Sequence, residues 1–132
     1  MMRESCKITS TDLAPKAIGT YSQGIHLGNT IYFSGQIGLN PSSMELENTF
    51  EEQLAQTLSN VKGLLESEGL NTNHIIKTTI FLTDLSQFPK VNKAYEEFFS
   101  KPFPARSCVE VSALPKEAQI EIEVIAAKDG SI

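Results

Sequence analysis

The residues best suited to chemistry lie near the end of the chain, where polar side chains interrupt a strand-like pattern. In the segment 105–111, Arg106, Cys108 and Glu110 occupy alternate positions and therefore share one face of the expected strand. A guanidinium can bind an anion through parallel hydrogen bonds, a thiol can act as a nucleophile, and a carboxylate can carry protons. The three side chains thus offer anion binding, nucleophilic attack or acid–base chemistry.

The next strand-like segment, 120–124, alternates in the same way and carries Glu121 and Glu123 between apolar residues. If both strands turn their apolar residues toward the core, the two glutamates lie on the same sheet face as Arg106 and Cys108. Two interpretations of that face remain open. It is either a solvated outer surface, which is common in antiparallel sheets, or a subunit interface that encloses a pocket. Cysteine is among the most buried residue types, which favours the interface.

Other kinds of site find little support in the sequence. The two histidines, His26 and His74, are far apart, and no HxH or CxxC spacing is present, so we expect no metal site. The sequence also contains no glycine-rich phosphate loop and no GxSxG turn. We therefore expect no cofactor.

Composition and charge are those of an ordinary globular protein. The chain has 132 residues, of which 40% are hydrophobic and 20% charged, and its net charge is -5. We expect one domain over residues 1–132, with residues 1–13 as a flexible or edge segment. An acidic protein repels a phosphate backbone, which argues against a broad nucleic-acid interface. The polar N-terminus has no signal-peptide core, and no apolar run approaches about 20 residues, so we expect a cytoplasmic protein that does not enter a membrane.

Hydrophobic periodicity predicts strands and helices in the order ββαβαββ. Gly28-Asn29 suits a tight hairpin turn between two short strands. A helix is expected to begin at Phe50, behind a capping box of Thr49 and Glu52, and to stop at Gly69. The later elements are a strand at 74–82, a second helix, and strands at 105–112 and 119–127. The second helix carries Phe88, Val91, Tyr95 and Phe98 on one apolar face and tolerates Pro89 in its first turn. Two amphipathic helices on one face of a mixed sheet give an α+β fold.

Several motifs occur in a fixed order along the chain. The longest is the run Phe103-Pro104-Ala105-Arg106-Ser107-Cys108-Val109-Glu110-Val111, which is followed by Leu114-Pro115-Lys116 and Ile120-Glu121-Ile122-Glu123. Nearer the N-terminus are Ala17-Ile18-Gly19-Thr20-Tyr21-Ser22-Gln23-Gly24 and Phe33-Ser34-Gly35-Gln36-Ile37, and the middle contains Asn60-Val61-Lys62, Lys77-Thr78-Thr79 and Val91-Asn92-Lys93-Ala94-Tyr95. Over residues 14–127, this sequence resembles the RidA/YjgF/L-PSP family.

The resemblance implies a fold like that of chorismate mutase, with a mixed six-stranded sheet, two helices on one face, and three copies that join their sheets into a barrel-like core. It also implies a metal-free deaminase that hydrolyses 2-aminoacrylate and related enamines and imines, such as 2-iminobutanoate and 2-iminopropanoate, to 2-keto acids and ammonia. The implied partners are a small 2-imino or 2-keto acid and further copies of the chain, with active sites at the interfaces of a homotrimer.

Position in the family's motifs also implies a role for individual residues. Arg106 is implied to bind the substrate carboxylate, and Glu121 to hold or orient the attacking water. The other residues implied to line the substrate pocket are Tyr21, Ser34, Gly35, Asn92 and Cys108. A guanidinium fork suits a carboxylate, and a glutamate within reach of the water can shuttle protons.

Each of these roles has a structural alternative. Arg106 could form a structural salt bridge at an interface, to Glu121 or Glu110, and Glu121 could be only an interface charge. Tyr21 could belong to the core, and Asn92 could tie a helix to the sheet. Cys108 could be a nucleophile, but only Arg106 lies near it in sequence to lower the pKa of its thiol, which favours pocket lining.

Two other functions remain open for the whole protein. The first is an endoribonuclease of the L-PSP type, although the acidic charge and the lack of a catalytic histidine pair speak against it. The second is a trimeric module without enzymatic activity that binds a regulator or acts as a chaperone.

Overall fold

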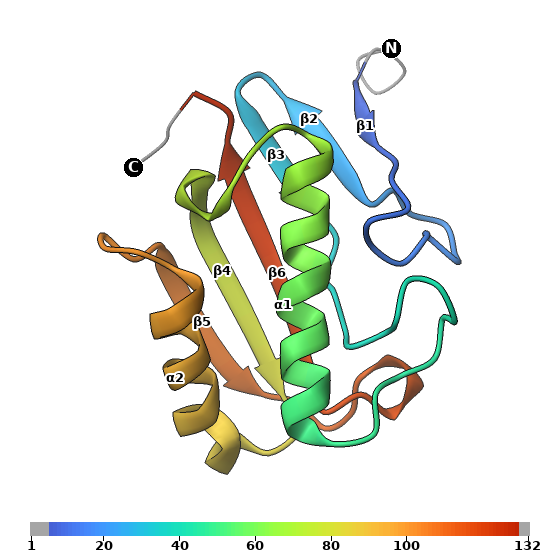
Figure 1. The fold of residues 1–132 in the computed structure, drawn as a ribbon, viewed down its shortest axis with the longest axis vertical. Coiled ribbons are helices and arrows are strands. Elements are labelled where there is room, and N and C mark those ends of the chain that lie inside the picture. The colour runs from blue at the N-terminus through green and yellow to red at the C-terminus, as the bar shows by residue number, and fades with distance from the viewer. Residues whose placement is uncertain (1–5, 130–132) are drawn as a thin grey trace.

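The computed structural model of the chain describes residues 6–129 and contains one sheet with two α-helices (Figure 1). Residues 1–5 of the expected N-terminal segment lie outside the described residues. The strands are β1 (Ile8–Thr9), β2 (Gly24–Leu27), β3 (Thr30–Phe33), β4 (Ile75–Leu82), β5 (Ala105–Glu110) and β6 (Ile120–Ala127), and the helices are α1 (Phe50–Ser67) and α2 (Phe88–Phe98). Short 3₁₀ turns, η2 (Thr72–His74), η3 (Leu85–Gln87) and η4 (Pro115–Glu117), precede β4, α2 and β6. The order ββαβαββ is confirmed, and β1 adds a further strand in front of it.

The six strands form a mixed sheet in the order β1-β2-β3-β6-β4-β5. Neighbouring strands are antiparallel except for β4 and β5, which run parallel. In Figure 1, β1 and β5 lie at opposite edges of this sheet. The sheet and its two helices confirm the α+β fold class predicted from the sequence.

The turn and cap signals of the sequence explain where these elements begin and end. Gly28 has a φ of +59°, as the hairpin between β2 and β3 requires. At the start of α1, the Thr49 side chain accepts from the amide of Glu52, and the Glu52 carboxylate accepts from the amide of Thr49, each at 3.1 Å. The helix ends at Ser67, two residues before Gly69, whose φ is +73°.

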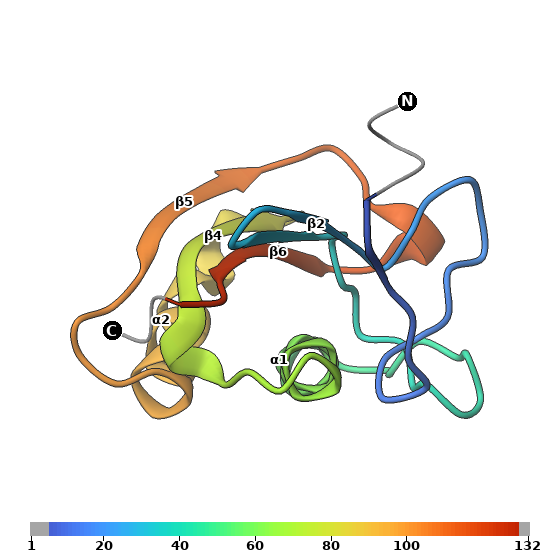
Figure 2. The same ribbon diagram turned by 90° about the horizontal axis from the view of Figure 1, so that it is seen from above.

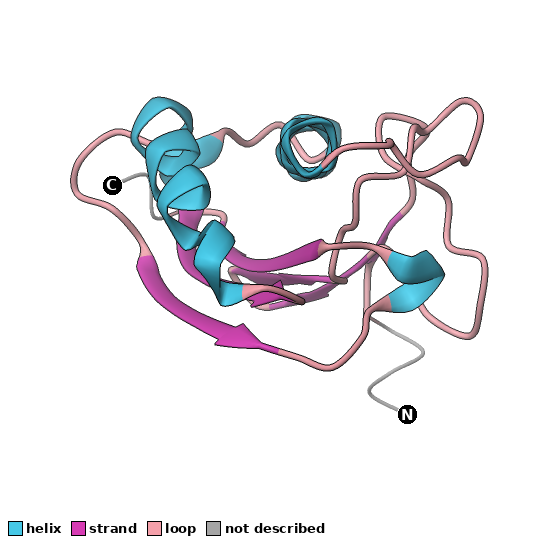
Figure 3. Cartoon of the chain, turned by 90° about the horizontal axis from the view of Figure 1, so that it is seen from below, coloured by secondary structure: helices cyan, strands magenta, loops and turns pink. Residues whose placement is uncertain are grey.

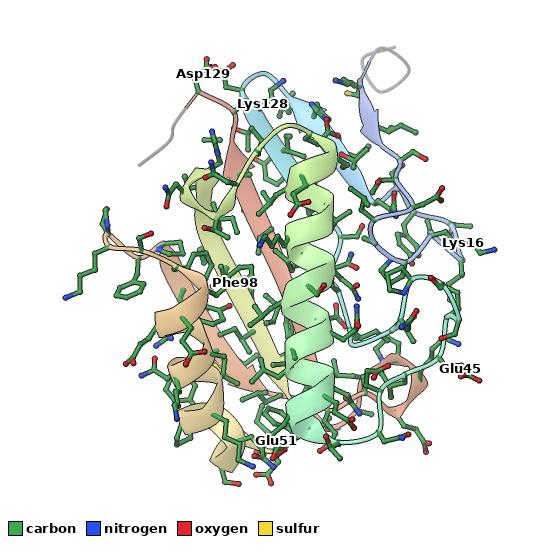
Figure 4. The ribbon with its side chains drawn as sticks, viewed as in Figure 1. Lys16, Glu45, Glu51, Phe98, Lys128 and Asp129 are labelled. Atoms are coloured by element: carbon green, nitrogen blue, oxygen red, sulfur yellow. The ribbon has the colours of Figure 1, made fainter. Side chains whose placement is uncertain are left out.

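Both helices cover the same face of the sheet, and no helix within residues 6–129 covers the opposite face (Figures 2 and 3). The core lies between the helices and the sheet, where the side chains fill the layer beneath α1 (Figure 4). Its fully buried members include Ile31, Leu65, Ile80 and Ile122. On the open face, by contrast, Tyr32 remains 47% exposed, so this face carries apolar surface that a single chain leaves uncovered. Within the described residues, neither helix is long and apolar enough to cross a membrane.

The expectation that Arg106 and Glu121 share a sheet face is wrong. In the sheet, Cys108 of β5 pairs with Ile80 of β4, and Ile80 pairs in turn with Ile122 of β6. These three residues lie on the face that the helices cover. Arg106 is two residues from Cys108 on β5, so its side chain points to the same face.

Glu121 and Glu123 lie on the open face. Phe81 of β4 pairs with Val109 on one side and with Glu121 on the other, so these three side chains point away from the helices. The sequence pattern misled because Val109 is apolar without being part of the core; this residue is 44% exposed, on the open face.

Candidate active site

Arg106 is held against one face of α2. Its Nη1 donates a hydrogen bond of 3.0 Å to Oδ1 of Asn92. Its Cζ lies 4.9 Å from the centre of the Phe88 ring and 5.7 Å from that of the Tyr95 ring. The three partners are spaced one helical turn apart, so α2 presents them as a single surface. The two cation–π contacts and the hydrogen bond fix the guanidinium, although Arg106 is exposed in the single chain.

A cavity of about 390 Å³ opens beside this guanidinium. Its lining consists of Asn92, Tyr95, Glu96, Phe103, Pro104 and Arg106. Burial raises the pKa of Tyr95 to about 12, so its ring stays neutral beneath the cation at physiological pH. The cavity therefore offers a fixed positive charge against aromatic walls, which suits an organic anion.

Glu121 lies in a second cavity, of about 510 Å³. Of the predicted site residues, this cavity is lined by Tyr21, Ser34, Gly35 and Glu121. A Cβ atom added at Gly35 would overlap Oε2 of Glu121. Because Gly35 has no side chain, the carboxyl group of Glu121 can pack against the backbone that follows β3.

The surroundings of Glu121 make it a better proton acceptor than an ordinary glutamate. Burial raises the pKa of its carboxyl group, and the charge of the neighbouring Glu123 raises it further. Glu123 lines the same cavity, as do Lys16 and Lys116. In the described part of the chain, neither carboxylate forms an ion pair with a lysine or arginine. Glu121 can therefore take up and release a proton.

Hydrogen bonds from two side chains, one partly buried and one buried, hold the walls of the Glu121 cavity. Oγ of Ser34 donates to the carbonyl oxygen of Ser22 at 2.6 Å, so this hydroxyl has a structural partner. Nε2 of Gln23 donates to the carbonyl oxygen of Pro15 at 2.8 Å, and its Oε1 accepts from the amide of Thr11 at 2.7 Å. Gln23 thereby fixes the N-terminal loop that carries Lys16, which Figure 4 shows beyond α1 on the side opposite α2.

Cys108 packs partly buried against the hydrophobic core and lines neither of the two cavities. Burial raises the pKa of its thiol, and the nearby charge of Arg106 offsets this only in part. The thiol therefore stays protonated at neutral pH, which disfavours a nucleophilic role. Among residues 6–129, no three side chains of His, Cys, Asp and Glu gather closely enough to hold a metal ion.

The predicted site residues thus fall into two groups that one chain does not bring together. Arg106 and Asn92 lie at the edge formed by β5 and α2, whereas Glu121 and its neighbours lie around β6 and the loops beside β3. Strand β4 separates β5 from β6, and Arg106 and Glu121 point to opposite faces of the sheet. Each group has its own cavity.

Comparison with known proteins places the chain in a family. Residues 11–128 match the family model described as Endoribonuclease L-PSP. The chain belongs to the L-PSP family. A protein of Escherichia coli strain K12 named 2-iminobutanoate/2-iminopropanoate deaminase is 50% identical over 125 residues, which cover 92% of this chain and 98% of that protein.

Solved structures of L-PSP relatives share the fold. RidA from the Antarctic bacterium Psychrobacter sp. PAMC 21119 is 44% identical and superposes with a TM-score of 0.89, covering 92% of this chain and 98% of that one. TdcF of E. coli, solved with bound serine, is 43% identical with a TM-score of 0.87 and the same coverage. The resemblance stated from the motifs is therefore confirmed at the level of family and fold.

Sequence reasoning overlooked part of the site of this L-PSP protein. Helical periodicity places Phe88 and Tyr95 on the apolar face of a helix, yet both rings contact Arg106. Phe88 and Tyr95 lie one helical turn before and after Asn92, and this spacing could have indicated that all three share one surface of the helix. Gln23 was also missed, because nothing in a lone glutamine indicates that it holds a loop.

Proposed function

We propose that this chain is a deaminase that hydrolyses 2-iminobutanoate, 2-iminopropanoate and related 2-imino acids, including those derived from 2-aminoacrylate, to 2-keto acids and ammonia. The observation that carries the proposal is the guanidinium of Arg106, fixed by Asn92 and two aromatic rings at the mouth of a small cavity. The E. coli relative with this activity in its name, 50% identical over nearly the whole chain, supports the same reaction.

Arg106 is proposed to grip the acid end of the substrate. Asn92 engages one N–H of the guanidinium, so other donors remain for two parallel hydrogen bonds to a carboxylate. Serine, the amino acid bound in the TdcF structure, carries the same carboxylate group as a 2-imino acid. Fixing this end of a small molecule positions its C2 atom for attack, and part of the reaction barrier is met by that positioning.

Glu121 is proposed to move the protons. Its carboxylate takes a proton from water as the water oxygen bonds to C2 of the protonated imine, and the resulting acid gives that proton to the amino nitrogen. The C–N bond then breaks, ammonia leaves with the bonding electrons, and the hydroxyl proton passes to the Glu121 carboxylate as the C=O bond forms. The raised pKa of Glu121 makes it a stronger base for the first step. The imine carbon is electrophilic already, so we propose that neither metal nor cofactor is required.

The complete site is proposed to form between copies of the chain in a homotrimer. The Arg106 cavity and the Glu121 cavity lie on different surfaces, so a contact that joins one to the other is heterologous. Heterologous contacts close into a ring when the rotation between neighbouring copies returns to its start, and three is the number of copies that the family resemblance implies. The exposed apolar residues Tyr32, Phe103 and Val109 support burial of this surface by a second copy.

We propose that the protein acts in the cytoplasm. Cys108 is a free cysteine that is only partly buried, which suits a reducing compartment.

The activity is tested with 2-aminoacrylate generated by an added dehydratase. The wild-type protein is expected to speed the release of 2-keto acid. Arg106→Ala should lower kcat/KM by about 100-fold or more, because it removes a bidentate charged contact, and Arg106→Lys should retain part of the activity. A folded wild-type protein that does not change the rate would refute the proposal.

Sharing of the site is tested by mixing two inactive variants. Arg106→Ala and Glu121→Ala chains, co-expressed in equal amounts, should form mixed trimers in which about one quarter of the interfaces combine an intact Arg106 with an intact Glu121. About one quarter of the wild-type activity should therefore return. If the site were contained within one chain, the mixture would be as inactive as each variant alone. Sedimentation analysis measures the number of chains in the assembly.

A further inference from the structure

Glu123 lies beside the proposed proton carrier but takes no part in the reaction as described so far. Glu121 and Glu123 are two residues apart on β6, so they lie on the same face of the sheet, about 7 Å apart along the strand. Both line the cavity that also contains Tyr21 and Ser34. Glu123 additionally borders a smaller cavity with Tyr32.

We infer that Glu123 is a positioning residue for the proposed reaction, which acts through Glu121 by keeping it able to hold a proton. This inference rests on the proposed function. A guanidinium supplied by a second copy would favour the ionised form of Glu121 and weaken it as a base. A second carboxylate on the same strand face opposes that effect, because two neighbouring negative charges disfavour each other.

The other charged groups around this pair are lysines. Lys16 on the N-terminal loop and Lys116 on the turn before β6 line the shared cavity, and Lys77 of β4 lies in the smaller cavity beside Glu123. Neither glutamate forms an ion pair with any of them in the part of the chain that the structure describes. The remaining partners around Glu121, such as Gly35 and Gln36, are uncharged. Among residues 6–129, no ion pair therefore neutralises the charge of Glu123, and this charge also raises the pKa of Glu121.

The pH dependence of kcat/KM for 2-imino acid hydrolysis tests the inference. Protonation of Glu121 should produce the acid limb of the profile, and Glu121→Gln should abolish both that limb and most of the activity. In Glu123→Gln, the limb should move to lower pH by about half a unit to one unit, because a repelling charge is gone. The plateau should fall about two- to threefold, because a weaker base accepts protons less readily.

Three further variants make the outcome specific. Glu123→Asp keeps the charge and should leave the limb near its wild-type position, whereas Glu123→Ser, which suits a strand, should repeat the shift if Glu123→Gln folds poorly. Glu97→Gln removes an exposed carboxylate on α2 and should shift nothing. An active Glu123→Gln enzyme with an unmoved limb would overturn the inference while leaving the deaminase intact.

A titration that does not require activity separates the two proposals. The ¹³C carboxyl resonance of Glu121, assigned by its loss in Glu121→Gln, should titrate at lower pH in Glu123→Gln than in the wild type. An inactive wild-type protein would refute the proposed function. An unchanged titration of Glu121 would refute the role of Glu123.

Discussion

Asn92 on α2 accepts a hydrogen bond from Arg106 on β5, with 3.0 Å between Oδ1 and Nη1. A neutral acceptor fixes the guanidinium without cancelling its charge. We therefore predict that Asn92→Asp harms activity more than Asn92→Ala does. Loss of a hydrogen bond to a charged group costs about 1.5–3 kcal/mol, so Asn92→Ala should lower kcat/KM about 10- to 100-fold. An aspartate would also compete with the substrate carboxylate for Arg106 and raise KM further.

Steady-state kinetics with 2-iminobutanoate measure both variants. Lys93→Ala, at the neighbouring position of α2, is the control and should behave as wild type, since Lys93 lines a cavity between α1 and α2 and not the Arg106 cavity. An Asn92→Asp protein with wild-type KM would contradict the proposed hold of Arg106 on the substrate.

Gly35 and Gly19 form a matched pair for testing the place of Glu121. A Cβ atom at Gly35 would overlap Oε2 of Glu121, whereas at Gly19 it would meet only the ring of Tyr21 at an ordinary 3.5 Å. We expect Gly35→Ala to lower kcat at least 10-fold by displacing the carboxylate. Because the displaced atom is the end of a flexible side chain, stability should change by less than about 1 kcal/mol.

In Gly19→Ala, both kcat and stability should stay near their wild-type values. Activity assays and chemical denaturation of the two variants measure the difference. Equal activity of the two proteins would mean that Glu121 can work from another position.

The sequence sufficed for the elements whose signals are local. The capping box at Thr49, the hairpin at Gly28 and the helix with Pro89 in its first turn all formed where the sequence predicts them. Each of these three features depends on residues that are only a few positions apart in the sequence. Local patterns of this kind specify the backbone conformation directly. The family motifs likewise identified the fold, because they span nearly the whole chain.

The sequence did not determine how the site residues are arranged in space. Alternation along β5 correctly grouped Arg106 with Cys108, but it could not decide which face of the sheet they occupy. Apolar residues such as Val109 normally indicate the buried face of a strand. In this chain, however, the open face of the sheet also carries apolar residues, so the pattern does not distinguish the two faces. The separation of Arg106 from Glu121 therefore required the strand pairing through β4.

Gly63 in the middle of α1 gives a prediction about stability. Alanine is worth about 0.5–1 kcal/mol more than glycine inside a helix, so propensity alone would make Gly63→Ala stabilising. A Cβ atom here, however, would overlap the backbone carbonyl oxygen of Leu13. The backbone cannot move aside as a side-chain end can, so we expect a net loss of about 1–3 kcal/mol.

Thermal and chemical denaturation of Gly63→Ala measure this loss. The loop that docks on Gly63 also forms a wall of the Glu121 cavity through Pro15 and Lys16. A fall in kcat/KM should therefore accompany the loss of stability. A protein more stable than wild type would show that the loop can shift without cost.

Glu68, at the end of α1, is predicted to make stability depend on pH. Its Oε2 accepts a hydrogen bond of 2.6 Å from Thr9 and lies 3.0 Å from Nε2 of His26, and its side chain is only 10% exposed. Burial raises the pKa of this carboxyl group, but the hydrogen bonds from Thr9 and His26, with the charges of His26 and Lys7, outweigh burial and leave the pKa below its ordinary value. The ionised form thereby ties β1 and β2 to the helix.

A carboxyl group whose pKa is lower in the folded than in the unfolded state stabilises the protein above its unfolded pKa, which is about 4.3 for glutamate. That contribution is lost as the pH falls through the lower, folded value. Glu68→Gln should therefore be less stable than wild type by about 1–2 kcal/mol at pH 7, and the difference should shrink below about pH 4. Urea denaturation of both proteins across this range measures it. Glu66→Gln, which removes an exposed carboxylate on the same helix, is the control, and its difference in stability from wild type should not change with pH. If the difference in stability between wild type and Glu68→Gln stayed constant down to pH 3, the charge of Glu68 would contribute nothing to holding β1 and β2.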